Sequence, residues 1–310
     1  MKTGTDAVPT IARPRPAATI RHELLGEMRV PTFADFEAAA RRIAPHVLRT
    51  PLLRSPKLDR LAGAPVWLKA ESLQVTGSFK ARGAFNAMLA MSPAQRARGV
   101  VAYSTGNHGQ GIAWAAKTLG IAATVVMPID APRNKVEKAT AQGTLALEAL
   151  QDLPAAARRD LGLFAAPCGG GGLSAGCGLV LDALSPDTRQ IAVEPAGFDD
   201  TVVSLARGER TPNAPGATTL SDALMAAIPA ELPWAINARY LAGAVAVSDA
   251  EVRTAVRFAL EELRVLVEPG GAVALAALLA GRLDPQGRDA VIVLSGGNID
   301  TALLQALLAD

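Results

Sequence analysis

The sequence has little cysteine, little net charge and few charged residues, and each shortage excludes a class of protein. Two cysteines in 310 residues, Cys168 and Cys177, are too few for a disulfide framework or a four-ligand zinc site. We expect both to be small buried side chains. A net charge of +2 disfavours a dedicated nucleic-acid binder. With 50% hydrophobic and 19% charged residues, the chain is not a disordered polyelectrolyte.

Aromatic residues, lysines and long apolar runs are also scarce. Aromatics make up 4% of the chain, so alanine, leucine and valine must build the core. There are seven lysines, none after Lys138, which leaves few candidates for lysine chemistry. No apolar run reaches the roughly 18 to 20 residues that a membrane-spanning helix needs. Residues 1–25 hold three prolines and no apolar segment, so we expect a disordered leader, no membrane association and a cytoplasmic location.

Short apolar runs alternate with alanine-rich amphipathic stretches, which predicts βαβ units and a mostly parallel sheet. The expected strands are Pro65–Lys69, Gly99–Ser104, Ala122–Pro128, Gln190–Glu194, Ala244–Ser248 and Ala290–Ser295. The expected helices are Thr32–Ile43, Arg82–Met91, Gly109–Leu119, Lys135–Leu150, Leu173–Leu184, Ser248–Leu263, Gly271–Ala280 and Ile299–Ala309.

A run of four glycines, Gly169 to Gly172, precedes Leu173 and an expected helix. Glycines let the backbone approach a ligand closely, and a helix N-terminus offers free N–H groups, so the run predicts a phosphate site. A flexible turn is the alternative. The run also fits the dinucleotide pattern G-x-G-x-x-A through Gly170, Gly172 and Ala175, with Glu194 at the end of the next strand, which would indicate a nicotinamide-dependent oxidoreductase.

Three further motifs decide against the dinucleotide interpretation. Thr76–Ala84 reads T-G-S-F-K-A-R-G-A, Ser104–Gly111 reads S-T-G-N-H-G-Q-G, and Ser295–Asn298 reads S-G-G-N. With the glycine run they resemble, from about Phe33 to about Leu307, the fold-type II pyridoxal-phosphate enzymes, in particular the threonine/serine dehydratase and serine racemase group. The resemblance implies a two-domain α/β fold with mostly parallel twisted sheets flanked by helices, and a homodimer.

The resemblance also implies a role for each motif residue. Lys80 would bond to the cofactor aldehyde and later transfer the proton, Phe79 would pack on the pyridine ring, and Asn107 would bind the ring oxygen. Ser295 would face the pyridine nitrogen. Gly169, Gly170, Gly171, Gly172 and Leu173 would bind the phosphate, and Ser104, Thr105, Gly106, Asn107 and His108 would bind the substrate carboxylate. The activity implied is dehydration of L-threonine or L-serine to a 2-oxo acid and ammonia.

Thr105 keeps a second activity open. In the racemases of this group a serine at this position acts as acid or base on the opposite face of the cofactor, whereas many dehydratases have alanine. The threonine hydroxyl therefore allows racemisation as a minor activity, although its β-branch restricts the rotamers. Related enzymes also act on other hydroxyamino acids.

The segment after the fourth expected strand resembles the group's divalent-cation site. Glu194, the Phe198 carbonyl and Asp200 would be the ligands, and all are hard oxygen donors of the kind that Mg²⁺ or Ca²⁺ requires. The alternative is that Asp199 and Asp200 only add negative charge to the N-terminus of a helix ending near Arg207.

The largest departure from the group is an apparent internal deletion. Thr140 runs directly into A-Q-G-T at Ala141–Thr144, so roughly 40 residues of the small domain are missing by family length. We expect a large domain of residues 26–98 and 142–310 and a truncated small domain of residues 99–141 with at most two strands. The stretch Pro154–Gly162 also lacks the expected apolar strand. A cofactor-binding remnant without activity is therefore a further hypothesis.

Overall fold

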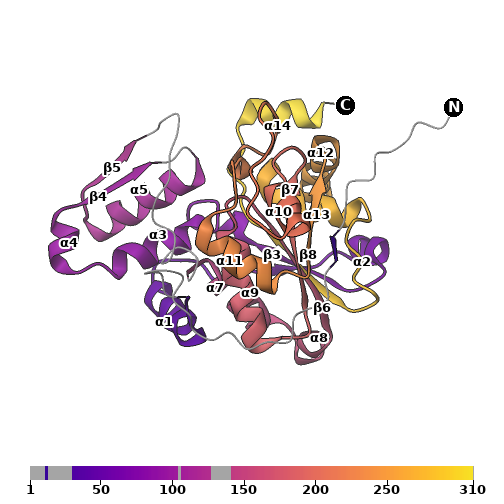
Figure 1. Ribbon diagram of the computed structural model, residues 1–310, viewed down its shortest axis with the longest axis horizontal. Coiled ribbons are helices and arrows are strands. Elements are labelled where there is room, and N and C mark those ends of the chain that lie inside the picture. Colours follow the sequence, from indigo (N-terminus) through magenta and orange to yellow (C-terminus); the bar gives the residue numbers. More distant parts are fainter. Residues whose placement is uncertain (1–10, 13–29, 104–105, 127–140, 310) are drawn as a thin grey trace.

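The computed structural model describes residues 11–12, 30–103, 106–126 and 141–309, and its body is a seven-stranded sheet with helices on both faces (Figure 1). The strand order is β1-β8-β7-β6-β9-β3-β2. The five inner strands are parallel, and the two-residue edge strands β1 and β2 are antiparallel to their neighbours. The strands of this sheet are β1 (Ile11–Ala12), β2 (Leu52–Leu53), β3 (Val66–Ala70), β6 (Leu161–Pro167), β7 (Arg189–Pro195), β8 (Gly243–Val247) and β9 (Asp289–Leu294).

Alternate residues of the central strand β6 enter two different hydrophobic clusters. Leu163 and Ala165 pack with α12 (Asp249–Phe258) and α13 (Pro269–Leu279), whereas Phe164 and Ala166 pack on the opposite face. The two-residue period of a strand places successive side chains on opposite faces, so both faces of this sheet are covered. The remaining helices of the large body are α1 (Phe33–Ile43), α2 (Pro56–Ala62), α7 (Thr144–Asp152), α8 (Ala155–Arg159), α9 (Gly172–Leu184), α10 (Asp200–Arg207), α11 (Glu231–Tyr240) and α14 (Thr301–Leu308).

The expectation that the stretch before the glycine run lacks a strand is wrong. Residues 155–159 form α8, and β6 follows from Leu161, every residue of it buried, in the middle of the sheet. Leu161, Leu163, Phe164 and the two alanines of β6 are all buried because helices cover both faces. Gly162 leaves room for the Arg288 side chain, whose Cβ would lie 2.7 Å from an added Cβ.

A second, smaller group of elements forms a lobe beside the large sheet (magenta in Figure 1). Its members are α3 (Lys80–Leu89), α4 (Pro93–Ala97), β4 (Val100–Tyr103), α5 (Asn107–Leu119) and β5 (Ala123–Val126). The two strands pair in parallel, and one hydrophobic cluster joins Phe85 and Met88 of α3 to Ile112 and Ala115 of α5. In the described part of the chain this sheet therefore has two strands, and Val101 on it is 78% exposed. The domain boundaries at 98/99 and 141/142 stay a prediction.

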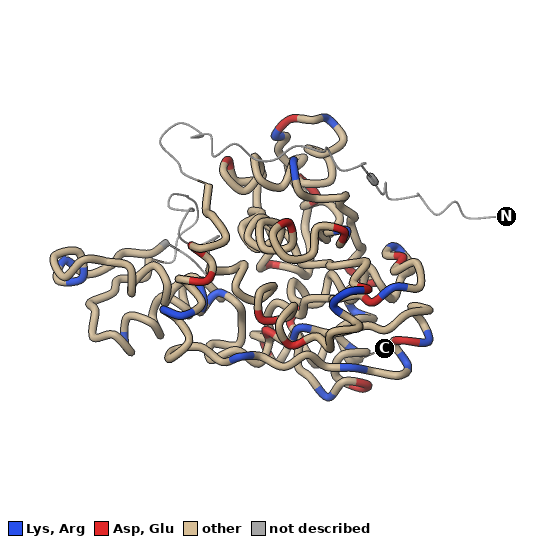
Figure 2. Tube along the Cα trace, turned by 90° about the horizontal axis from the view of Figure 1, so that it is seen from below, with Lys and Arg blue, Asp and Glu red and all other residues tan. Residues whose placement is uncertain are grey.

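The mixed α/β fold with a mostly parallel sheet confirms the expected fold class. Of the helix expected over 135–150, residues 135–140 lie outside the described residues, as does most of the expected leader 1–25. Within the described ranges no helix is long and apolar enough to cross a bilayer. Figure 2 shows basic and acidic residues interspersed over the trace.

Candidate active site

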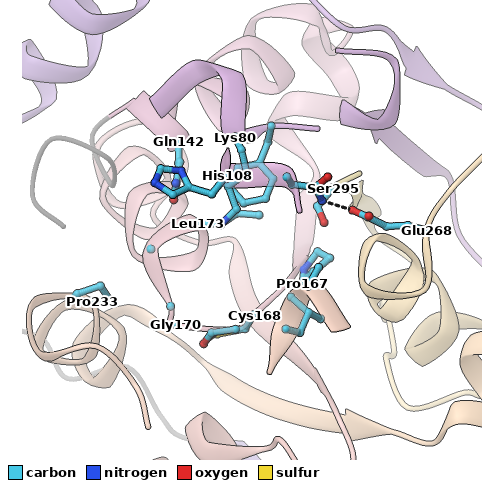
Figure 3. A pocket seen from close by; sticks show the side chains of 17 residues that line it. Lys80, His108, Gln142, Pro167, Cys168, Gly170, Leu173, Pro233, Glu268 and Ser295 are labelled. Carbon is cyan, nitrogen blue, oxygen red and sulfur yellow. Dashed lines mark hydrogen bonds between the residues drawn. The ribbon is translucent and has the colours of Figure 1, made fainter. Parts of the chain in front are cut away.

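A cavity of about 240 Å³ opens where the neighbouring strands β9 and β6 end (Figure 3). Carboxyl ends of parallel strands are the usual place for ligand loops in such sheets. The predicted site residues that line the cavity are Phe79, Lys80, Asn107, His108, Gly169, Gly170, Gly171, Gly172, Leu173 and Ser295. Gly106 precedes α5 and is not among the lining residues, and Ser104 and Thr105 lie outside the described residues.

Lys80 is the first residue of α3, and main-chain hydrogen bonds hold the segment before it. Phe79 N donates to Ser295 O at 3.1 Å, and Gly297 N donates to Gly77 O at 2.8 Å. The Lys80 Nζ atom lies 4.7 Å from the centre of the Phe79 ring. Main-chain hydrogen bonds thus join the lysine motif to the loop after β9, and Lys80 directly follows the joined segment.

The glycine run connects β6 to α9 and forms the floor of the cavity. Gly171 has φ +83°, which glycine adopts without strain. A Cβ there would lie 2.8 Å from Asn237 Nδ2, which donates to Gly171 O. The first-turn amides of α9 have no intrahelical acceptor, so the loop presents N–H groups and the positive end of a helix dipole. This geometry is a cradle for an anion.

Three side chains fix one another at the wall of the cavity. Asn107 Nδ2 donates to Glu268 Oε1 at 2.5 Å, shown by the dashed line in Figure 3. Asn298 Nδ2 donates to Asn107 Oδ1 at 2.6 Å and to Thr76 O at 2.8 Å. Burial raises the pKa of Glu268 to about 7, with a further increase from Asp222, while the hydrogen bond from Asn107 and the charge of Lys80 act against it.

Sequence reasoning assigned no role to Glu268, Gln142, Asn298, Pro233 and Leu224 in this region, although Asn298 belongs to the S-G-G-N motif. The first two carried a partial signal: Glu268 stands before Pro269-Gly270-Gly271, an unusual helix start, and Gln142 lies in the A-Q-G-T segment. Cys168 also lines the cavity, and burial raises the pKa of its thiol, so the group stays protonated near neutral pH. Both cysteines are free and buried, as expected.

A buried charge network lies behind the lysine. Arg82, two residues along α3, donates to both carboxylate oxygens of Glu71 at 2.8 Å and to those of Glu148 at 2.7 and 2.8 Å. Lys69 donates to Glu148 at 2.8 Å. Arg82, Glu71 and Lys69 are fully buried. The network ties the helix that carries Lys80 to β3 and α7.

The predicted cation ligands lie away from the cavity, at the start of α10. Glu194 accepts from Thr201 N at 3.1 Å and Val202 N at 3.0 Å, so it caps this helix. Asp200 Oδ1 accepts from Asn213, and Asp200 Oδ2 is buried with no hydrogen-bond partner within the described ranges. No cluster of three or more His, Cys, Asp or Glu side chains suited to a metal occurs in the described part of the chain. The cation site stays a prediction, with Asp200 Oδ2 as the available ligand atom.

Comparisons with known proteins agree with this architecture. The model of the family described as pyridoxal-phosphate dependent enzyme matches residues 43–144 and 138–296. The L-threonine ammonia-lyase of Thermotoga maritima is 34% identical, covering 89% of this chain and 78% of the relative. The crystal structure of the T.th. threonine deaminase is 40% identical with a TM-score of 0.80, covering 87% of this chain and 99% of the other. Maize serine racemase is 31% identical with a TM-score of 0.82, covering 89% and 97%.

The same comparisons agree in length with the expected internal deletion. The alignment with the Thermotoga maritima relative runs over 319 positions, although 89% of this chain is about 276 residues, so about 43 positions have no residue here. The two matches to the family model overlap at residues 138–144. The expected junction between Thr140 and Ala141 lies within that overlap.

Proposed function

The chain belongs to the family of pyridoxal-phosphate dependent enzymes, in its threonine dehydratase and serine racemase branch, and from this premise we propose that it is an ammonia-lyase. The proposed reaction removes water from L-threonine or L-serine, and the resulting enamine takes up water again and gives a 2-oxo acid and ammonia. One observation carries the proposal: a lysine, an anion cradle and a neutral hydroxyl line the same cavity.

The residues present fit pyridoxal phosphate. The cradle at Gly171, which a Cβ would fill, suits the phosphate, and the α9 amides complete its donor set. Lys80 would hold the aldehyde end, Asn107 the ring oxygen and Ser295 the pyridine nitrogen. When bound, the cofactor draws electrons from the amino acid and makes its Cα proton acidic.

The chain's own groups then perform the proton transfers. In this proposal Lys80 Nζ takes the Cα proton, and the substrate hydroxyl departs with a proton as water. Ser295 is 4% exposed and uncharged, so it does not stabilise a protonated pyridine nitrogen as a carboxylate would. That moderates the electron withdrawal and suits elimination over transamination.

The lining also supports a preference among hydroxyamino acids. Of the described lining residues, only Lys80 and His108 can carry a positive charge. A substrate with a second carboxylate, such as hydroxyaspartate, would therefore compete for groups that the reaction and the first carboxylate use. We infer a preference for uncharged side chains, that is, threonine and serine.

The test is a spectrum followed by an assay. The protein is mixed with pyridoxal phosphate, and the absorbance band of the lysine-bound cofactor is recorded. L-threonine, L-serine and hydroxyaspartate are then supplied, and the 2-oxo acids are measured. Lys80→Ala should lose both the band and the product. Lys57→Ala, which removes an exposed lysine paired with Glu262, should keep both. A wild-type protein that forms neither 2-oxobutanoate from L-threonine nor pyruvate from L-serine contradicts the proposal.

Racemisation is the second candidate, favoured by the similarity to maize serine racemase and by the Thr105 hydroxyl in the sequence. Chiral analysis of serine after incubation measures it directly. A cofactor-binding remnant would give the absorbance band without either product. The glycine run serves the phosphate of pyridoxal phosphate here, so no nicotinamide cofactor is invoked. A homodimer stays an expectation from the resemblance.

A further inference from the structure

The orientation of the Asn107 amide is determined by its two partners. Glu268 offers a carboxylate, which when ionised can only accept, so it must face the NH₂ group of Asn107. On the other side, Asn298 Nδ2 faces Thr76 O, which also can only accept, so its NH₂ group is directed toward Asn107 Oδ1 as well. Two acceptors from distant segments therefore fix the direction of both amides.

This orientation has a consequence for the cavity. Asn107 Nδ2 carries two hydrogens, and Glu268 takes one of them. The Asn107 carbonyl oxygen is directed toward Asn298. Because Asn107 lines the cavity, the second N–H is the group it can offer to a ligand with an acceptor oxygen. A reversed amide would present its carbonyl oxygen to that ligand and repel it.

We propose that Glu268 is a positioning residue that, together with Asn298, holds the Asn107 amide with its N–H toward the ring oxygen of bound pyridoxal phosphate. The inference rests on the proposed cofactor site, but it does not depend on which reaction follows. Glu268 is 5% exposed and comes from the start of α13, whereas Asn107 starts α5. The contact therefore joins the large sheet to the smaller lobe.

Protonation of Glu268 would weaken this constraint. A protonated carboxyl can donate, so it can pair with the amide carbonyl of a reversed Asn107 as well as with its NH₂ group. The pKa of Glu268, about 7, places this change in an accessible range. The titratable groups around it are Lys80 from α3 and Asp222 from the short turn η2 (Asp222–Leu224), with His108 and Cys168 on the same cavity.

The experiment measures the dissociation constant of pyridoxal phosphate by absorbance at pH 6, 7 and 8, for the wild type and three variants. Glu268→Gln can present either an acceptor or a donor, so it should bind pyridoxal phosphate about tenfold more weakly than the wild type at pH 8. Between pH 6 and pH 8 the affinity of the wild type should improve more than the affinity of Glu268→Gln. Asn298→Ala should bind more weakly but keep the pH dependence, because Glu268 remains. Glu231→Gln makes the same chemical change at an exposed position and should match the wild type.

Two readouts separate positioning from folding and from turnover. Thermal unfolding of the cofactor-free proteins should show Glu268→Gln no less stable than the wild type, since a buried ionisable group has been replaced by a neutral one. Wild-type affinity and an unchanged pH profile in Glu268→Gln would refute the positioning role. A wild type that binds the cofactor but yields no 2-oxo acid would refute only the proposed ammonia-lyase activity. A wild type that does not bind it would refute both.

Discussion

Replacing Arg82 should destabilise the protein more than any surface change. Its guanidinium contacts Glu71 and Glu148, and Lys69 supplies the second positive charge of the network. The two positive charges of this network therefore balance its two negative charges. Arg82→Met keeps the apolar stem but leaves one uncompensated negative charge in the interior, next to a Glu71 carboxylate that is fully buried.

The expected loss follows from that arrangement. Removing one partner of a buried ion pair costs about 3–5 kcal/mol in free energy of unfolding. For a protein of this size, 1 kcal/mol corresponds to about 2–4 °C, so the melting temperature should fall by roughly 10 °C. Urea unfolding of the cofactor-free protein, followed by circular dichroism, measures the loss. Arg257→Met is the matched control: its pair with Glu261 is exposed, at 3.9 Å, and should change stability by at most about 0.5 kcal/mol.

The pH dependence gives an independent check. Burial by itself would raise the pKa of Glu71, but the charge of Arg82 and its hydrogen bonds outweigh it and hold the pKa below 4.5. The stability that Glu71 contributes is therefore complete above its ordinary pKa and is lost as the pH falls through 4.5 toward the lowered folded value. Arg82→Met should lack this acid-side loss. The double variant Arg82→Met with Glu71→Gln should recover part of the deficit, because no unpaired charge remains at Glu71. A single-variant loss below about 1 kcal/mol, or no recovery in the double variant, would refute the reasoning.

Three further changes test other parts of the structure. Gly171→Ala should weaken pyridoxal-phosphate binding at least about tenfold, because the φ of +83° and the contact with Asn237 leave no room for a methyl group, while circular dichroism stays unchanged. If Asp200 is a cation ligand, Mg²⁺ or Ca²⁺ should raise the wild-type melting temperature and not that of Asp200→Asn; no rise in the wild type would favour the interpretation that the acidic residues only serve the helix. Asp300 caps α14 by accepting from Ala302 N and Leu303 N, so Asp300→Ala should cost about 1 kcal/mol in urea unfolding with unchanged product formation.

The sequence alone was sufficient to predict the parts of the site that contiguous motifs carry. The lysine motif, the glycine run and Ser295 each follow a strand, and the carboxyl ends of neighbouring parallel strands meet at one edge, so their convergence could be expected. The strand β6 was missed because its run of apolar residues is short and the arginines of α8 stand just before it. This segment can be a central strand because helices cover both faces of the sheet, and its own sequence does not indicate those helices.

Glu268 was missed for a different reason. An acidic residue before Pro269 is what any helix N-terminus favours, so the unusual helix start after Glu268 does not by itself indicate a contact with Asn107. Its contact with Asn107 joins positions 161 residues apart, and nothing in the spacing of either residue indicates it. The same holds for Arg82 and Glu148, which are 66 residues apart.

The bond between Asn298 and Thr76 spans 222 residues, and the loop after β9 also receives the backbone of the lysine motif. During synthesis the lysine leaves the ribosome long before the strand that completes its surroundings. A nascent chain stopped before β9 would have the glycine run and the reactive amine, but neither Ser295 nor the main-chain partner of Phe79. The complete cavity can therefore form only after β9 and the loop that follows it have been synthesised.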